Sequence, residues 1–214
     1  MTESCKTRAP RGRPKDLGKR QAILQAAADL FMANGPDAVS MDDIAKAAGV
    51  AKLTLYSHFD TKDALFQQII IDKCHEHDVN GRFDDLAQLP PREALHRLGQ
   101  NFIQLILSPE ALSMHRIIEG GLASPKMARV FHEAGPVAVK KEFSKLAQRW
   151  QKQGQMSTRW SPDDLADMFF CLIKGMLHME LVLGLRKRPS AADIKAYAAL
   201  RVDLFLAAVA PENP

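Results

Sequence analysis

The residues best suited to chemistry in this sequence lie near its start, in the stretch PRGRPKD at positions 10–16. Two arginines flank a glycine and two prolines flank them in turn, so this segment resists helix formation and carries positive charge on an extended backbone. Residues 5–20 hold seven Lys or Arg against one acid, whereas the rest of the chain is nearly balanced and the net charge is only +4. Such a block is typical of an arm that binds nucleic acid or, less often, an acidic membrane surface.

Two further clusters have the residue types of a metal site. At helical spacing Cys74, His77 and Asp78 share one face, as a metal-sensing regulator would require, but a solvated helix end has the same pattern. Glu93 and His96 form one half of a di-iron carboxylate motif, and the second half is missing. The sequence also lacks a Gly-rich phosphate loop and a nucleophile elbow. We therefore predict no metal, no cofactor, no catalytic residue and no enzyme activity.

Length and composition indicate a globular protein of the cytoplasm. With 214 residues the chain can form one large domain or two small ones around a sizeable core. Its three cysteines are few and far apart, which argues against a disulfide framework and fits a reducing compartment. The start of the chain has no signal-peptide pattern, and charged residues interrupt the most apolar stretch, residues 165–185, so we predict no membrane span.

The elements that must position these residues are helices. Apolar residues recur at helical spacing along almost the whole chain, and no segment alternates convincingly as a strand would. We predict an all-α fold of about nine helices, with three or four short helices before five or six longer ones. Ser40, Ser161 and Ser190 are strong start signals, because a serine caps the first turn and the following acids complement the helix dipole. The pair Gly135-Pro136 is expected just before a new helix.

The segment SMDDIAKAAGVAKLTLYSHF, residues 40–59, predicts two short helices joined by a tight glycine turn. This arrangement is a helix-turn-helix, whose second helix enters the major groove of DNA. At helical spacing Leu55 and Phe59 face the core, where we expect them to pack on Phe31 and Ile44. The opposite, outer face carries polar and exposed groups: Lys52, Leu53, Thr54, Tyr56, Ser57 and His58.

Over about 55 residues, from GRP at 12–14 to DTKDALF at 60–66, the sequence resembles the TetR/AcrR family of bacterial transcriptional regulators. The family pattern combines a capped short helix, Ala-x-x-Ala-Gly-Val, a Thr-Leu-Tyr-x-His-Phe recognition helix and a Lys-Asp/Glu-x-Leu start to the fourth helix. One departure is Ala51, where the family often has a capping Ser or Thr. The stretch RIIEGGLASPKMARVFHEAGP, residues 116–136, is more loosely similar to the AefR-like branch.

The resemblance implies a set of DNA contacts. Ser40 would cap its helix and meet a phosphate, and Lys62 would contact a phosphate at the positive end of the fourth helix. The recognition helix would place Lys52, Leu53 and Thr54 at the groove floor and direct Tyr56 and His58 to the DNA backbone. The variable positions among them carry the base specificity, so the operator sequence cannot be deduced from these residues.

The basic arm adds a second mode of binding. A three-helix reader in the major groove leaves the adjacent minor groove empty, and PRGRPK matches the core of an AT-hook. In that motif Arg11 and Arg13 would enter a narrow A·T-rich minor groove while the intervening glycine lets the backbone approach its floor, and Lys15 would add charge. The alternative is a solvated basic tail that raises affinity without specificity.

For the second half the resemblance implies an effector-binding and dimerisation domain. We divide the chain into a flexible arm (1–16), a helix-turn-helix domain (17–62) and this larger helical bundle (63–214). Because the helix at 165–185 is apolar nearly all round, we expect it and the Ile194–Ala208 helix to meet a partner subunit in a four-helix bundle. The predicted walls of an effector pocket are Phe102, Ile106, Met114, Ile118, Phe143, Met168, Leu172 and Met176.

Together these features predict a homodimeric cytoplasmic repressor, which lies on the nucleoid when it binds a palindromic operator and is released by a small apolar effector. Two alternatives stay open within DNA binding, an activator and an effector-independent protein that coats DNA. A metal-sensing regulator is a third.

Overall fold

The computed structural model describes residues 17–79 and 83–211, in which every regular element is helical, so the all-α prediction is confirmed. The N-terminal helices are α1 (Leu17–Asn34), α2 (Met41–Ala47), α3 (Lys52–His58) and α4 (Lys62–Glu76). They are followed by α5 (Phe83–Leu86), α6 (Pro91–Ile106), α7 (Pro109–Glu119), α8 (Pro125–His132), a π-helical turn η1 (Glu133–Val137), α9 (Ala138–Lys152), α10 (Pro162–Val182) and α11 (Ala191–Ala208). The four-residue α5 was not predicted.

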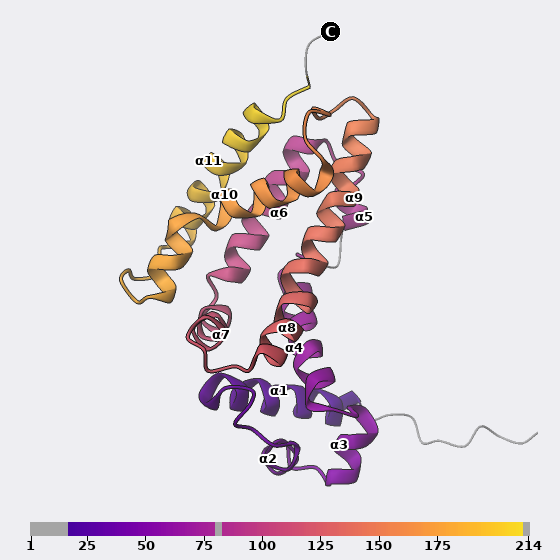
Figure 1. Cartoon of the computed structure of the whole chain (residues 1–214), viewed down its shortest axis with the longest axis vertical. Coiled ribbons are helices and arrows are strands. Elements are labelled where there is room, and N and C mark those ends of the chain that lie inside the picture. The colour runs from indigo at the N-terminus through magenta and orange to yellow at the C-terminus, as the bar shows by residue number, and fades with distance from the viewer. Residues whose placement is uncertain (1–16, 80–82, 212–214) are drawn as a thin grey trace, which may run out of the picture.

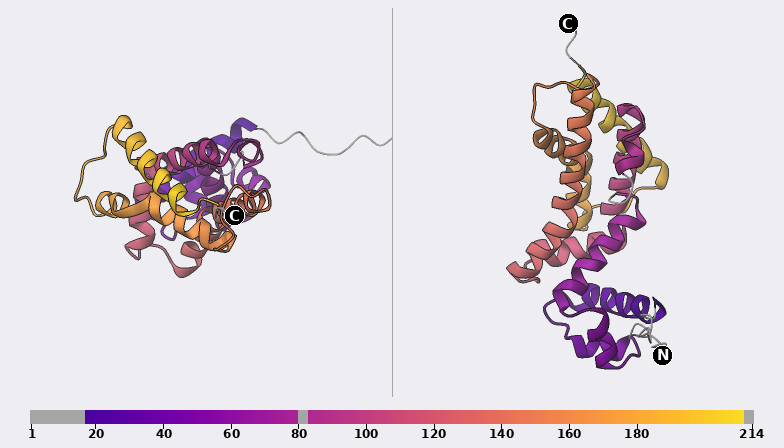
Figure 2. Two further views of the ribbon diagram at one scale, coloured as in Figure 1. Left: turned by 90° about the horizontal axis from the view of Figure 1, so that it is seen from above. Right: turned by 90° about the vertical axis from the view of Figure 1, so that its right-hand side faces the viewer.

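The molecule is elongated, with helices α1, α2 and α3 at one end and the long helices α6, α9, α10 and α11 at the other (Figure 1). Helix α4 leaves the small N-terminal group and runs toward the long helices, and α1 lies across the base of the bundle in the side view (Figure 2). None of the helices in the described ranges combines the length and the apolar character that crossing a membrane requires.

Serine caps set the starts of five helices. In each case the hydroxyl accepts a hydrogen bond, 3.1–3.3 Å long, from the backbone N–H three residues later. The five are Ser40, Ser108, Ser124, Ser161 and Ser190. At α2 and α11 the cap is reciprocal, because Asp43 and Asp193 accept from the backbone N–H of the capping serine. The predicted starts at Ser40, Ser161 and Ser190 are therefore confirmed.

Two hydrophobic cores lie along the molecule. The first joins α1–α4 around the edge-to-face pair Phe31 and Phe66, whose centroids are 5.5 Å apart, and it also takes in Met114 and Met127 from α7 and α8. The second fills the long helices, where Phe143 stacks on Phe169. Helices α7 and α8 thus share a core with the DNA-binding helices, which ties the two ends of the molecule together.

Two local features of the bundle depart from regular α-helix. At Gly135-Pro136, which we expected just before a new helix, the chain instead passes through η1, so α8 continues into α9 through a π-helical turn. This turn accommodates Pro136, which has no N–H to donate. Helix α10, predicted as one apolar helix, bends at Gly175, whose φ of 48° and ψ of −165° suit glycine alone. The hydroxyl of Tyr197 donates to the freed carbonyl of Lys174 at 3.3 Å.

Candidate nucleic-acid interface and ligand cavity

Helices α2 and α3 form the predicted helix-turn-helix. Leu55 and Phe59 are buried in the same core as Phe31 and Ile44, as the helical spacing predicts. The guanidinium of Arg20 lies over the Phe59 ring, 5.2 Å from its centroid, and closes this core from the α1 side. Helix α3 therefore has a fixed inner face, and its outer face is the one that can meet DNA.

The outer face of α3 is exposed at its start. Leu53 is 83% exposed and Tyr56 is 39% exposed, while Thr54 and His58 are half-buried. The ammonium of Lys52 pairs with Asp42 on α2 at 2.8 Å, and the hydrogen bond to this carboxylate raises the pKa of Lys52. An exposed pair of this kind contributes little to stability, so a DNA phosphate can replace the carboxylate at small cost.

The start of α3 has no side-chain cap. Its N-cap residue, Ala51, makes no side-chain hydrogen bond, as the sequence led us to expect. Toward the other end of α3, the buried Nδ1 of His58 has no hydrogen-bond partner among the described residues. The predicted contact of His58 with the DNA backbone stays a prediction.

Lys62 has a structural role that the sequence did not reveal. Its ammonium donates to the backbone carbonyls of Val39 at 3.0 Å and Asp37 at 3.2 Å, so it fastens the start of α4 to the loop before α2. An ammonium has three hydrogens, which leaves one for the predicted phosphate contact. Thr61 caps α4 by accepting from the N–H of Ala64 at 3.1 Å.

A polar latch joins the same loop to α8. The Asp37 carboxylate accepts the Ser124 backbone N–H at 2.5 Å and the Ser124 hydroxyl at 2.8 Å, and Lys126 pairs with Asp63 at 2.6 Å. Burial acts to raise the pKa of Asp37, but the Ser124 hydrogen bonds and the charges of Lys62 and Lys126 outweigh it and lower the pKa. Because Asp37 and Ser124 are distant in sequence, no local pattern predicted this contact.

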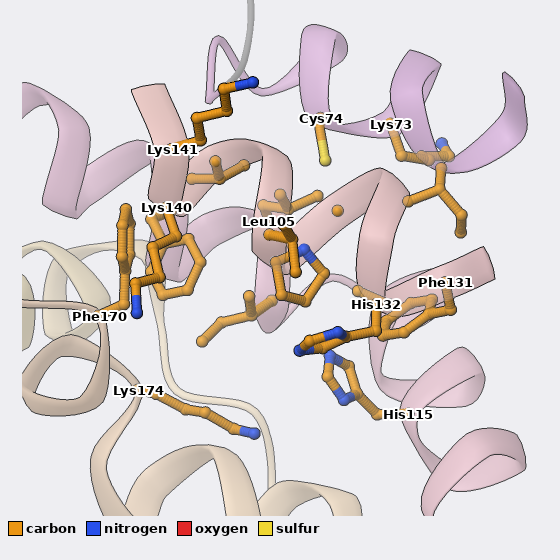
Figure 3. Close-up of a pocket in the computed structure, with 18 of the residues that line it drawn as sticks. Lys73, Cys74, Leu105, His115, Phe131, His132, Lys140, Lys141, Phe170 and Lys174 are labelled. Atoms are coloured by element: carbon orange, nitrogen blue, oxygen red, sulfur yellow. The ribbon is translucent and has the colours of Figure 1, made fainter. Parts of the chain in front are cut away.

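A cavity of about 980 Å³ lies between the helix-turn-helix end and the bundle. Its walls come from α1, α4, α6, α7, α8, η1, α9 and α10, and Figure 3 shows part of this lining. The size is that of a small-molecule site. Of the residues predicted to form an effector pocket, Phe102, Ile106 and Met114 line this cavity.

The structure places the other five predicted wall residues elsewhere, which corrects that part of the interpretation. Phe143 is fully buried in the second core, where it stacks on Phe169. Met168 and Met176 point outward from α10, with exposed fractions of 37% and 61%. Ile118 packs against the first core and Leu172 against the second. Helical spacing identifies a buried face, but it does not distinguish a face against the core from one against a cavity.

Sequence reasoning missed the charged part of the lining. Five lysines from α4, α9 and α10 surround the cavity, together with three acids and two histidines. They are Lys73, Lys140, Lys141, Lys145, Lys174, Glu110, Asp163, Asp167, His115 and His132. They come from separate helices, so only the packing of those helices brings them together.

One of the lining histidines, His115, contacts a buried histidine behind the cavity wall. The rings of His115 on α7 and His178 on α10 meet edge to face with centroids 4.5 Å apart. His178 is 1% exposed, and its Nε2 has no hydrogen-bond partner among the described residues. Burial, helped by charge repulsion from His115 and Lys174, lowers the pKa of His178 to about 3. Burial also lowers the pKa of His115, so both rings are neutral at pH 7.

The described ranges contain no group of three or more His, Cys, Asp or Glu side chains placed to hold a metal ion. Cys74 lies in the cavity wall, and its burial raises the pKa of the thiol to about 11, which disfavours the thiolate that a metal would need. Cys74, His77 and Asp78 share one face at helical spacing, but their side chains are not placed to hold a metal ion together.

Comparisons with known proteins agree with this architecture. A model of the tetR family of bacterial regulatory proteins matches residues 23–69, and a model of the C-terminal domain of AefR-like transcriptional repressors matches residues 93–211. The chain is similar to the HTH-type transcriptional repressor KstR of Rhodococcus jostii, with 30% identity over 190 residues, 88% of this chain and 82% of KstR.

A second relative is YdeS, an uncharacterized HTH-type transcriptional regulator of Bacillus subtilis, 31% identical over 125 residues. That match covers 56% of this chain and 59% of YdeS, less than two thirds of its length. Among solved structures, the Flavonoid-responsive Regulator FrrA superposes with a TM-score of 0.70 at 30% identity, covering 92% of this chain and all of FrrA.

The helix-turn-helix, the bundle behind it and these matches define a DNA-binding transcriptional regulator. The chain belongs to the TetR family. Regulators of this family are non-enzymatic, bind DNA and act as dimers.

Proposed function

We propose that this chain is a homodimeric repressor that leaves a palindromic operator when a small, largely apolar molecule fills the cavity. The observation that carries this proposal is the make-up of the cavity wall. Ala28 and Met32 of α1 and Ile69 and Ile70 of α4 line it, so a ligand there touches the helices that support the DNA reader. The similarity to KstR, which is a transcriptional repressor, supports repression over activation.

The mechanism passes through α4. A ligand that displaces α4 also moves Lys62 and Asp63 at its start, which bind the loop before α2 and Lys126 of α8. In a two-fold dimer this movement changes the spacing of the two recognition helices, which a palindromic operator requires at about 34 Å. A coupling of about 1–3 kcal/mol between the two sites would weaken operator binding about 5–150-fold.

On the DNA side we propose the contacts predicted from the sequence. The predicted set in the described ranges is Ser40, Lys52, Leu53, Thr54, Tyr56, His58 and Lys62. Arg11, Arg13 and Lys15 lie outside the described residues, so their place in the minor groove stays a prediction. We keep the assignment of residues 1–16 to an arm, 17–62 to DNA binding and 63–214 to effector binding and dimerisation.

The dimer would form through α10 and α11. Large apolar side chains are exposed along both helices, among them Met176 at 61%, Leu183 at 62%, Leu200 at 58% and Leu204 at 55%. A monomer rarely exposes so many on one surface, and a second copy of the same surface would bury them. We expect Leu204→Glu to give a monomer by analytical ultracentrifugation and to lose operator affinity, whereas Leu122→Glu, at a 69% exposed position outside this surface, should stay dimeric.

The DNA test is fluorescence anisotropy on the intergenic DNA beside the gene, over a salt series and with a scrambled competitor. Binding that resists the competitor and falls steeply with salt supports an operator-specific repressor. Binding that the competitor abolishes would favour the DNA-coating alternative. Deleting residues 1–15 should reduce the salt slope by about 0.9 for each phosphate that the arm neutralises, and an unchanged slope would contradict the role of the arm.

A further inference from the structure

Three polar residues, His115, His132 and Lys174, lie in one part of the cavity wall. His115 Nδ1 and the Lys174 ammonium both approach the Glu119 carboxylate, at 3.2 Å and 3.8 Å, and Figure 3 shows His132 in the same part of the lining. We call these three residues the Lys174 cluster. They come from α7, α8 and α10, and the adjacent cavity wall is apolar, with Leu105 and Phe131 close by.

Among the described residues, Lys174 and Lys141 are the two cavity lysines without a close ion pair, and Figure 3 shows Lys141 away from the two histidines. The ammonium groups of Lys140 and Lys145 lie 2.7 Å from Asp167 and 2.6 Å from Glu142, so both make close ion pairs. The nearest carboxylate oxygen to Lys174 belongs to Glu119 and is 3.8 Å away, beyond hydrogen-bonding distance. Among the described residues, Lys174 therefore has charge-assisted hydrogen bonds left to make.

Lys174, and not the histidines, supplies the positive charge for an acidic oxygen. His115 Nδ1 lies 3.2 Å from the Glu119 carboxylate, so a neutral ring donates there and leaves Nε2 as an acceptor. An acceptor cannot pair with an ionised acid, so the negative charge of the ligand is held by the Lys174 ammonium. Behind His115 the buried ring of His178 fills the space, so the charged group must bind on the cavity side.

The partly compensated ammonium of Lys174 favours one class of ligand. It repels an organic cation placed beside it and attracts an anion. A neutral apolar molecule would fit the apolar walls but would leave Lys174 with only the Glu119 carboxylate, 3.8 Å away. We propose that the effector is an apolar organic acid whose acidic oxygen binds the Lys174 cluster while its apolar body lies against α4 and α6. This proposal rests on the proposed effector role of the cavity.

The test uses three probes that share a twelve-carbon chain: dodecanoate, dodecan-1-ol and dodecylamine. Their affinities are measured by isothermal titration calorimetry on the full chain, on Lys174→Met and on Lys145→Met, which removes a cavity lysine that already has a partner. We expect dodecanoate to bind the unaltered protein and Lys145→Met at least about tenfold more tightly than the alcohol, as one charge-assisted hydrogen bond implies. Lys174→Met should lose this preference and keep its affinity for the alcohol, which also shows that the variant is folded.

The possible failures of the two proposals differ. Three results would overturn the acidic effector: equal affinity for the acid and the alcohol, tighter binding of the amine, or an acid preference that survives Lys174→Met. Each of them would still leave the cavity as the effector site. Operator release is measured in parallel by anisotropy. If none of the three probes binds, or if dodecanoate binds without weakening operator affinity, the effector role of the cavity is overturned together with this inference.

Discussion

Replacing His178 tests whether burial keeps the histidine pair neutral. The folded pKa of His178, about 3, lies below the value of about 6.5 for a histidine in the unfolded chain, so protons bind preferentially to the unfolded state. The contribution of neutral His178 to the free energy of unfolding is therefore fully present above pH 6.5 and is lost as the pH falls toward 3. Between pH 7 and pH 5 the protonated fraction of an unfolded histidine rises from about one quarter to nearly one while His178 stays neutral, which lowers the free energy of unfolding by about 2 kcal/mol.

The variant His178→Leu removes the titrating imidazole and replaces it with an apolar side chain of similar size in the buried position. We would measure urea denaturation by circular dichroism at pH 7 and pH 5, at one protomer concentration because a dimer's stability depends on it. The loss of stability between the two pH values should be about 2 kcal/mol smaller in the variant than in the unaltered protein. His77, whose pKa is also lowered, makes no ring contact with His178, so we expect it to contribute equally to both proteins and cancel. An identical pH dependence in the two proteins would refute the reasoning.

Three further outcomes follow from the packing. Gly175→Ala should lower stability by about 1–3 kcal/mol in urea denaturation, because φ is 48° and the added Cβ would meet the Tyr197 hydroxyl; an unchanged midpoint would contradict this. Ser40→Ala removes the cap of α2 and should lower the free energy of unfolding by about 1 kcal/mol, which is measured as a lower melting temperature. An unchanged melting temperature would disprove this role of the cap. Asp37→Ala breaks the latch to Ser124, so amide hydrogen exchange should accelerate in α8 and not in α10; equal exchange in both would count against the latch.

The prediction of the helix-turn-helix succeeded because its determinants are local. A serine cap acts on the next three residues, and helical spacing tells which side chains share a face. Ser40 and the inward-facing Leu55 and Phe59 could therefore be placed from neighbouring residues alone. The same reasoning identified α10 as apolar nearly all round and paired it with α11, and both expose large apolar side chains in the folded protomer.

The cavity was predicted less well because its wall is a product of packing. Met168 and Met176 have the residue type and spacing of wall residues, yet they point away from the cavity. The bend at Gly175 changes the direction of α10 partway along, and a sequence pattern that assumes a straight helix cannot include it. The lysines of the lining are brought around one space only by the packing of α4, α9 and α10, so no local pattern predicts that they share a site.

The sequence by itself determined the all-helical class, the starts of the capped helices, the two faces of α3 and the family. These depend on interactions within a few residues and on a motif with fixed spacing. Only the tertiary structure decided where α7 and α8 meet the DNA-binding helices and that Lys174 lies beside His115. It also decided that Lys62 joins α4 to the loop before α2 and that Asp37 joins this loop to the start of α8. Those relations join residues far apart in the chain, and their geometry exists only once the helices have packed.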